Sequence, residues 1–128
     1  MLAKLLFSEQ FSFSKGDSVV VIGLGRFGSS VAQSLTRLGH DVMGIDQDPE
    51  PVHAWADLLT HAVQADSTNV MALRQLGVAD FAHAIVGIGT DLAASLMTIM
   101  ALTELGIQDI WVKALTAEHG QIAMRIGA

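Results

Sequence analysis

The hydrophobic positions along this chain follow two alternating patterns. Short uninterrupted apolar runs, such as SVVVIG at residues 18–23, are typical of strands that are covered on both faces. Between these runs, apolar residues recur every three or four positions, which is the spacing of one side of a helix. The first helical stretch carries them at Phe27, Val31, Leu35 and Leu38. Gly39 marks its end, because glycine accepts the left-handed backbone that closes many helices.

Together, these patterns predict five strands that alternate with five helices. The strands are expected at residues 18–23, 40–46, 60–66, 81–89 and 109–115, and the helices at residues 26–39, 48–59, 67–77, 91–106 and 116–127. Short loops between such elements force parallel pairing with right-handed crossovers. The predicted fold is therefore an α/β, Rossmann-like doubly wound sheet with strand order 3-2-1-4-5. Ser67 or Thr68 is expected to cap the third helix, and Asp91 lies near the start of the fourth.

The fourth predicted helix lacks an ordinary polar face. Between Leu92 and Leu105 its only charged residue is Glu104. One side carries Leu92, Leu96, Ile99 and Leu102, and the others carry Ala93, Met97, Met100 and Ala101. A helix that lies on a sheet normally presents polar side chains to water. This one is expected to pack a second surface against another subunit or domain, the alternative being a core helix in a crowded fold.

Composition narrows the class of protein. The chain has 128 residues, of which 51% are hydrophobic and 16% charged, and its net charge of −6 argues against nucleic-acid binding. There is no cysteine, which excludes disulfides and thiolate metal sites. No apolar run reaches the roughly 18–20 residues of a membrane span. Glu9 interrupts the apolar start, so a signal peptide is not expected and the predicted location is cytoplasmic.

Residues 1–16 precede the regular pattern and form a predicted N-terminal arm. Its FSFS segment, residues 11–14, alternates with the period of a strand. The arm could add an edge strand, dock on a partner, or be a frayed end.

The strongest candidate for chemistry is the glycine-rich turn after the first strand. Gly23, Gly25 and Gly28 have the G-x-G-x-x-G spacing, between a buried strand and a helix. Gly23 permits a tight turn, Gly25 lets a pyrophosphate approach the backbone, and Gly28 lets the helix pack closely. The helix N-terminus offers N–H groups and partial positive charge to phosphate. Asp46, at the end of the second strand, can accept hydrogen bonds from ribose hydroxyls and repels a 2′-phosphate.

Further candidates follow the other strands, each with an alternative. Asp66 and Ser67 are expected near the ribose or adenine, but helix capping explains them equally well. Gly87 and Gly89 end the fourth strand, where they could admit a nucleotide or only form a tight turn. Lys113 ends the fifth strand and either faces the crevice or is solvated.

Catalytic machinery is not apparent in the sequence. There is no tyrosine, so the Tyr-Lys pair of short-chain dehydrogenases is excluded, and the five histidines are dispersed. No nucleophile–base pair and no metal site can be assembled from these residues. A nucleotide site without catalytic groups suggests a sensor and no enzymatic activity. The alternatives are the NAD-binding half of a dehydrogenase and an inert scaffold.

The motifs together resemble the RCK domain (regulator of conductance for potassium), also called the KTN or TrkA-N domain. The shared segments are VIGLGRFGSSVAQSLTRLGHDVMGID, THAVQADST, AIVGIG, IWVKA and the closing IGA, from about residue 17 to 128. The likeness is strongest to cytosolic subunits of Ktr/Trk-type potassium uptake systems. It implies a site for ATP, ADP or NAD(H), formed at the phosphate turn by Gly23, Gly25, Arg26, Phe27 and Gly28. Asp46 would bind ribose, Asp66 and Ser67 would line the adenosine end, and Gly87, Gly89 and Lys113 would lie near the phosphates.

The resemblance also implies partners and domain limits. Such domains form homodimers and an octameric ring beneath a separate membrane subunit that conducts potassium. Residues 17–128 would be the N-terminal lobe, and the family continues beyond IGA into a C-terminal lobe. Arg26 is the unusual residue of the turn: it could reach a terminal phosphate in its own or a neighbouring site, or be a solvated cation.

Overall fold

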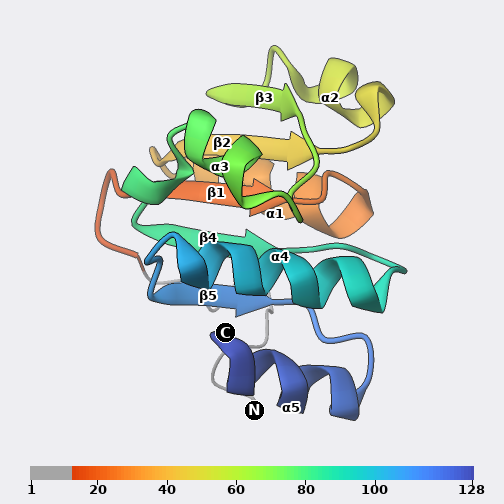
Figure 1. The fold of residues 1–128 in the computed structure, drawn as a ribbon. Helices are drawn as coiled ribbons and strands as arrows, with labels where there is room; N and C mark the ends of the chain where they lie inside the picture. The colour runs from red at the N-terminus through yellow and green to blue at the C-terminus, as the bar shows by residue number, and fades with distance from the viewer. Residues whose placement is uncertain (1–12) are drawn as a thin grey trace.

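The computed structural model describes residues 13–128. Its centre is a parallel sheet of five strands in the order β3-β2-β1-β4-β5, which confirms the predicted topology. The strands are β1 (Ser18–Ile22), β2 (Asp41–Asp46), β3 (His61–Gln64), β4 (His83–Val86) and β5 (Asp109–Val112). Figure 1 shows β3 and β5 at the two edges, with all five strands pointing the same way. The carboxyl ends of all five strands therefore lie along the same side of the sheet, perpendicular to the strand direction.

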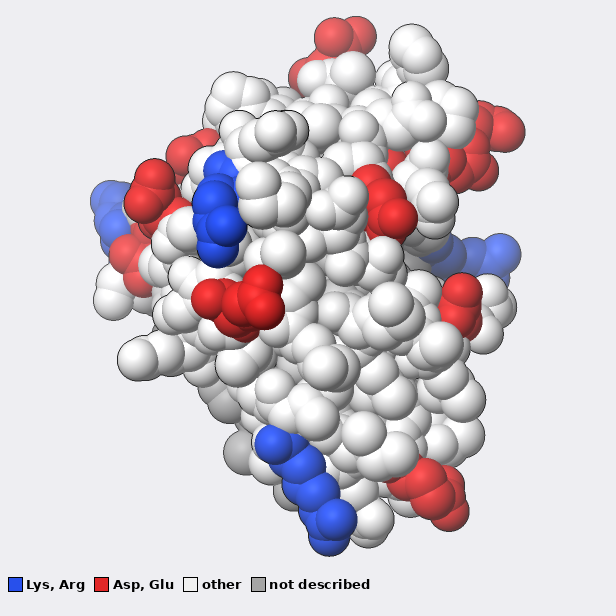
Figure 2. Space-filling model, viewed as in Figure 1, with Lys and Arg blue, Asp and Glu red and all other residues white. Residues whose placement is uncertain are grey.

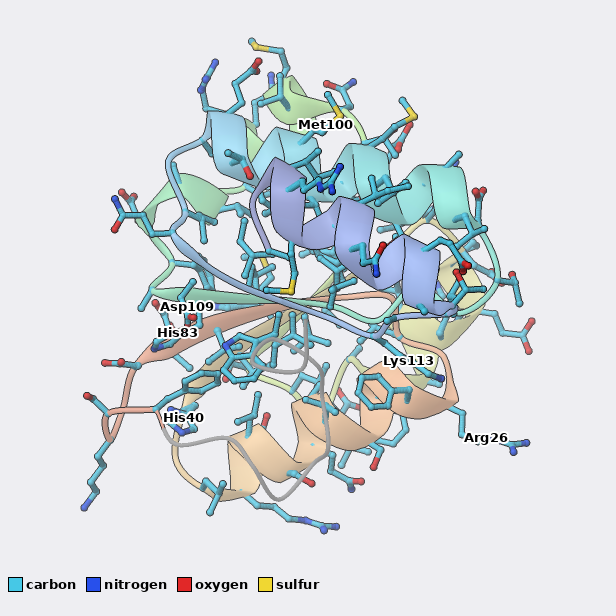
Figure 3. The ribbon with its side chains drawn as sticks, turned by 90° about the horizontal axis from the view of Figure 1, so that it is seen from below. Arg26, His40, His83, Met100, Asp109 and Lys113 are labelled. Atoms are coloured by element: carbon cyan, nitrogen blue, oxygen red, sulfur yellow. The ribbon has the colours of Figure 1, made fainter. Side chains whose placement is uncertain are left out.

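Helices cover both faces of this sheet. They are α1 (Arg26–Arg37), α2 (Pro49–Trp55), α3 (Val70–Gln75), α4 (Leu92–Glu104) and α5 (Ala117–Ile126), with a 3₁₀ turn η3 (Val78–Asp80). Figures 1 and 3 place α4 and α5 on one face and α1 on the other. No helix among residues 13–128 is long and apolar enough to cross a membrane.

The central strand shows why both faces must be covered. In β1, Val19 and Val21 belong to the apolar cluster under α1, while Val20 and Ile22 belong to the cluster under α3, α4 and α5. All four side chains are 0–2% exposed. A strand buried on both sides has no polar positions, which explains the unbroken apolar run in the sequence.

The elements are shorter than the patterns predict, and one expected cap is wrong. The third helix begins at Val70, and neither Ser67 nor Thr68 caps it. Instead, the Asn69 side chain accepts hydrogen bonds from the amides of Met71 and Ala72. The prediction missed this because serine, threonine and asparagine are all good caps and the pattern alone does not choose between adjacent ones.

The predicted N-terminal arm lies mostly outside the described residues. Residues 13–16 are described and form no strand. Phe13 packs against the cluster under α1. Its ring stacks on that of His83, with the centroids 3.9 Å apart.

Helix α4 buries one side and exposes apolar side chains on another. Ile99 and Leu102 are fully buried, but Met97 and Met100 are 51% and 57% exposed. Leu92, which the helical spacing groups with Ile99 and Leu102, is 43% exposed because it stands in the first turn of the helix. Figure 2 shows a broad patch without charged residues over α4, with Lys, Arg, Asp and Glu at its margin.

Candidate functional site

A cleft opens at the carboxyl ends of the strands. Its volume is about 380 Å³, and segments that follow all five strands contribute to it. Its lining residues are Ile22, Gly23, Gly25, Arg26, Phe27, Ile45, Asp46, Gln47, Asp66, Ser67, Thr68, Gly87, Ile88, Gly89, Asp91, Ala94 and Lys113. In a doubly wound sheet this edge is where ligands bind, because the strand order reverses there and the loops diverge.

Two glycines of the turn after β1 are required by the fold itself. Gly23 has a φ of +94°, which favours glycine over residues with a side chain. A Cβ atom on Gly28 would lie 1.6 Å from the carbonyl oxygen of Gly23, so any side chain there would push α1 away from the turn. Gly28 is also the one residue of the predicted site that does not line the cleft. Its packing role is confirmed by these contacts, whereas direct contact with a ligand stays a prediction.

Gly25 differs from its neighbours, because nothing in the part of the chain that the structure describes demands a glycine there. Its φ is −71°, an angle that other residues adopt readily. A Cβ atom built on it would meet no other atom within 4 Å. The residue is exposed, lines the cleft and stands at the N-cap position of α1. The missing side chain therefore leaves room for something outside the protein to approach the helix N-terminus.

Asp46 is held in a defined orientation at the end of β2. One carboxylate oxygen accepts a hydrogen bond from the amide of Leu24 at 2.7 Å, and the other accepts from the amide of Asp48 at 2.9 Å. These bonds connect the glycine turn to β2 and leave lone pairs on both oxygens, because a carboxylate can accept about four hydrogen bonds. Asp46 is thus a preorganised acceptor at the edge of the cleft.

Asp66 and Ser67 line the cleft after β3, and one Asp66 oxygen and the Ser67 hydroxyl already have partners within the protein. One Asp66 oxygen accepts from the amide of Thr68 at 3.0 Å and from its hydroxyl at 2.6 Å. These bonds lower the pKa of Asp66, because they favour the charged carboxylate. The Ser67 hydroxyl pairs with that of Thr98 on α4 at 2.8 Å.

Two cations stand near the glycine-rich turn after β1. Figure 3 shows Arg26 extending from the start of α1 away from the body of the protein, with Lys113 closer to the sheet. The Lys113 ammonium nitrogen lies 5.1 Å from the centre of the Phe27 ring, within cation–π range. That ring covers Gly87, whose Cβ would meet it at 3.2 Å. One cation therefore rests on an aromatic ring inside the cleft, and the other points into solvent.

Sequence patterns missed several residues of the cleft. Gln47, Ile88 and Ala94 line it without having been predicted, and so do Thr68 and Asp91, which were expected only near helix starts. Their common signal is position: each directly follows a strand or opens the next helix. Their residue types do not mark them as ligand-binding, so only their position at the end of a strand or the start of a helix could have predicted that they line the cleft.

A second polar cluster lies at the opposite end of the sheet. His83 places one ring nitrogen 2.5 Å from an oxygen of Asp109 and the other 2.8 Å from an oxygen of Asp17. Figure 3 shows His83 and Asp109 side by side, far from Arg26 and Lys113. Phe13 stacks on the imidazole. Among the residues that the structure describes, no group of histidine and carboxylate side chains has the arrangement of a metal site.

Comparison with known proteins decides the family. The family model described as the TrkA-N domain matches residues 19–128, nearly the whole described chain. The chain belongs to the TrkA-N family. It is 44% identical over 114 residues to the Ktr system potassium uptake protein A of Bacillus subtilis, in an alignment that covers 89% of this chain and 51% of that protein.

Other relatives of this TrkA-N domain carry similar names. The Ktr system potassium uptake protein C of Bacillus subtilis is 44% identical over 84% of this chain and 49% of its own length. Protein A of the Ktr system from Vibrio alginolyticus is 32% identical over the same shares of each chain. This TrkA-N chain thus spans about half the length of the curated relatives it matches.

Solved structures share its fold. The NAD(P)-binding domain of an exopolyphosphatase-related protein from Archaeoglobus fulgidus superposes with a TM-score of 0.76 at 23% identity, over 86% of this chain and 82% of that chain. The TrkA-N domain of the inner membrane protein YbaL from Escherichia coli gives 0.74 at 18% identity, over 90% and 84%. Both likenesses confirm a Rossmann-like architecture.

Proposed function

We propose that this TrkA-N domain binds an adenine nucleotide, ATP, ADP or NAD(H), and that it acts as a regulatory module in potassium transport. The observation that carries the proposal is the position of Gly25. It leaves the N-terminus of α1 uncovered over a cleft, although neither backbone angle nor packing requires a glycine there. Such a surface suits a phosphate group.

The cleft divides into a phosphate end and a ribose end. At the phosphate end, the uncovered amides of the first turn of α1 would donate to a diphosphate, with Lys113 close by. At the other end, Asp46 would accept from ribose hydroxyls and would repel a 2′-phosphate, which disfavours NADP. Asp66 and Ser67 would contact the adenosine, and Gly87 and Gly89 would allow the phosphates to lie close to β4.

Arg26 would distinguish ligands by their terminal phosphate. It is exposed and extends away from its own domain, so it can reach a γ-phosphate in its own site or in a neighbouring subunit. Hydrogen bonds to charged groups contribute about 1.5–3 kcal/mol, which is roughly 10- to 100-fold in affinity. A difference of that size between ATP and ADP can shift a two-state assembly.

The relatives suggest the physiological context. Proteins named as components of the Ktr potassium uptake system share 32–44% identity with this chain. We therefore infer a regulatory, non-enzymatic role for residues 17–128 beside a separate membrane subunit. The exposed apolar side of α4 would mediate a homodimer or an octameric ring, because a patch of this kind is typical of a contact surface.

One titration tests this proposal. ATP, ADP, AMP, NAD and NADH are added to the wild type and to Arg26→Ala, and affinity is measured by calorimetry and assembly size by light scattering. We expect the wild type to prefer one ligand by terminal phosphate or redox state, and Arg26→Ala to narrow any difference between ATP and ADP. Equal affinity for all five ligands would refute the sensor, because a ligand without preference shifts no equilibrium.

A second variant tests the pocket itself. Asp46→Ala removes the ribose acceptor, so every ribose-containing ligand should bind about tenfold more weakly or worse. Because Asp46 also anchors Leu24, thermal unfolding of the variant is measured in parallel. Unchanged affinity in a folded Asp46→Ala protein would show that the ligand binds elsewhere.

The same titration distinguishes the proposed sensor from a second candidate function, the NAD-binding half of a dehydrogenase. A structural neighbour named as an NAD(P)-binding domain favours it through the shared fold. That function predicts binding of NAD and NADH without any change in assembly size, and no effect of Arg26→Ala on ATP.

A further inference from the structure

Helix α4 buries two hydroxyl groups in an otherwise apolar sequence. Ser95 and Thr98 are both 0% exposed. A buried hydroxyl is unfavourable unless it has a hydrogen-bond partner, and alanine or valine would fill the same space without that requirement. Both hydroxyls have partners outside the helix, and these partners show to which parts of the protein α4 is connected.

The first connection leads to the floor of the cleft after β3. The Thr98 hydroxyl oxygen lies 2.8 Å from that of Ser67, and this pair is buried. Ser67 itself lines the cleft, next to Asp66. A ligand that displaces the segment after β3 therefore acts directly on the middle of α4.

The second connection leads to the segment after β5, on the other side of the cleft. The amide of Leu115 donates to Nδ1 of His119 at 2.9 Å, so the proton of a neutral ring is on Nε2. That nitrogen lies 3.0 Å from the Ser95 hydroxyl. Burial lowers the pKa of His119, which favours this neutral form. Leu115 is two residues beyond Lys113, which lines the cleft.

The helix also touches the cleft directly and reaches the surface on another side. Asp91 and Ala94, at its start, form part of the cleft wall. Met97, which follows in the next turn, is exposed, and so is Met100 further along the helix. An α-helix is stiff over this length, so a displacement at its first turn carries the exposed methionines with it.

We propose that α4 transmits ligand occupancy of the cleft to its exposed methionine face, with the Thr98–Ser67 and Ser95–His119 hydrogen bonds as the two connections. This inference rests on the proposed function, because it requires that a nucleotide binds in the cleft. Ser95 and Thr98 are positioning residues: neither lines the cleft, and they act through Ser67 and the β5–α5 segment.

The test follows the methionine methyl groups while a nucleotide binds. The protein is labelled with ¹³C-methyl methionine and titrated separately with ATP, ADP and NADH, and affinity is measured independently by calorimetry. In the wild type, we expect the Met97 and Met100 resonances to shift on saturation while that of Met71, on α3, moves less. In Thr98→Val and in Ser95→Ala, affinity should stay within about threefold, a small change for residues outside the contact. The Met97 and Met100 shifts should fall by about half in each variant and nearly vanish in the double variant.

Two further variants control for a purely structural role. Thr98→Ser keeps a hydroxyl and should restore the shifts. Thr103→Val removes a hydroxyl from the same helix, but one that donates to the carbonyls of Ile99 and Ile126, away from the cleft. It should leave the shifts unchanged. If Thr98→Val does not fold, Ser95→Ala tests the other connection independently.

The outcomes separate this inference from the proposed function. If none of ATP, ADP and NADH binds the wild type, the proposed function fails. If one of them binds but the Met97 and Met100 resonances do not move, or if they move equally in the double variant, nucleotide binding stands and the role of α4 is refuted.

Discussion

The two ends of the sheet both gather charged side chains, but they arrange them in opposite ways. At the amino end, His83 stands between Asp17 and Asp109, and Phe13 covers its ring. Both ring nitrogens lie within hydrogen-bond distance of a carboxylate oxygen. The polar groups at this end therefore find their partners within the protein.

At the carboxyl end, charged groups surround a space. Asp46 is oriented by two backbone amides, Arg26 extends into solvent, and Gly25 leaves a helix N-terminus uncovered. Within residues 13–128, these features stabilise the fold only through the bonds that Asp46 accepts from the amides of Leu24 and Asp48. The comparison teaches that a cluster of charges indicates a binding site only where the protein does not already pair them.

The largest effect is expected from Gly28, on the structural side of the glycine turn. In Gly28→Ala, the new methyl group would overlap the Gly23 carbonyl, so α1 must move. We expect the free energy of unfolding to fall by about 3 kcal/mol or more, as for severe overpacking. Urea unfolding measures it. Gly39→Ser, at a positive-φ position with open space, is the control and should cost only about 1–2 kcal/mol. A Gly28→Ala protein as stable as the wild type would contradict the close contact between α1 and the turn.

His83→Ala tests the amino end. It removes the imidazole between two partly buried carboxylates, so the unfolding free energy should fall by about 2 kcal/mol, the size of hydrogen bonds to charged groups. Nucleotide affinity should not change, because the cleft lies at the other end. His61→Ala, an exposed histidine at the start of β3, is the matched control and should be as stable as the wild type. Weaker nucleotide binding by His83→Ala would contradict the expectation that the cluster around His83 does not contribute to the cleft.

Gly25→Ser should have the opposite effect to His83→Ala: nucleotide affinity should fall while stability is kept. Serine fits the backbone angle, meets no neighbouring atom and is a favoured N-cap residue, so stability should be kept or slightly raised. Its side chain would enter the space above the helix N-terminus, and ATP should bind about tenfold more weakly, which is about 1.4 kcal/mol. Calorimetry and urea unfolding on the same samples measure both. A loss of stability with unchanged affinity for ATP would show that Gly25 serves the fold and not ligand binding.

The smallest expected effect concerns pH and His119. Because burial lowers its pKa, the unfolded chain takes up a proton more readily than the folded protein as the pH falls below the ordinary value of 6.5. The folded state is therefore fully stable above that pH, loses stability below it, and loses no more once His119 is protonated in the folded protein. Urea unfolding between pH 7.5 and 5 should show a flatter profile for His119→Gln than for the wild type. An identical profile would mean that His119 is accessible to water.

Much of the fold and part of the cleft could be predicted from the sequence. The strand order follows from alternation and short connections, which leave few ways to pair parallel strands. Gly23, Gly25 and Asp46, which line the cleft, and Gly28, which packs α1 against the turn, could be predicted because their spacing reflects local backbone demands of one strand–turn–helix unit. The cap of α3 was wrong, because adjacent polar residues compete for one position and only the final backbone path decides between them.

By itself, then, the sequence determined which segments are strands and helices and where the glycine-rich turn lies, because both depend on neighbours along the chain. Only the tertiary structure decided that His83 is enclosed by two carboxylates, that Gly25 faces open space while Gly28 does not, and that Ser95 and Thr98 connect α4 to both sides of the cleft. The hydrogen bonds of His83, Ser95 and Thr98 join residues between 24 and 66 positions apart. Such contacts arise from packing of the sheet and its helices, which no local pattern encodes.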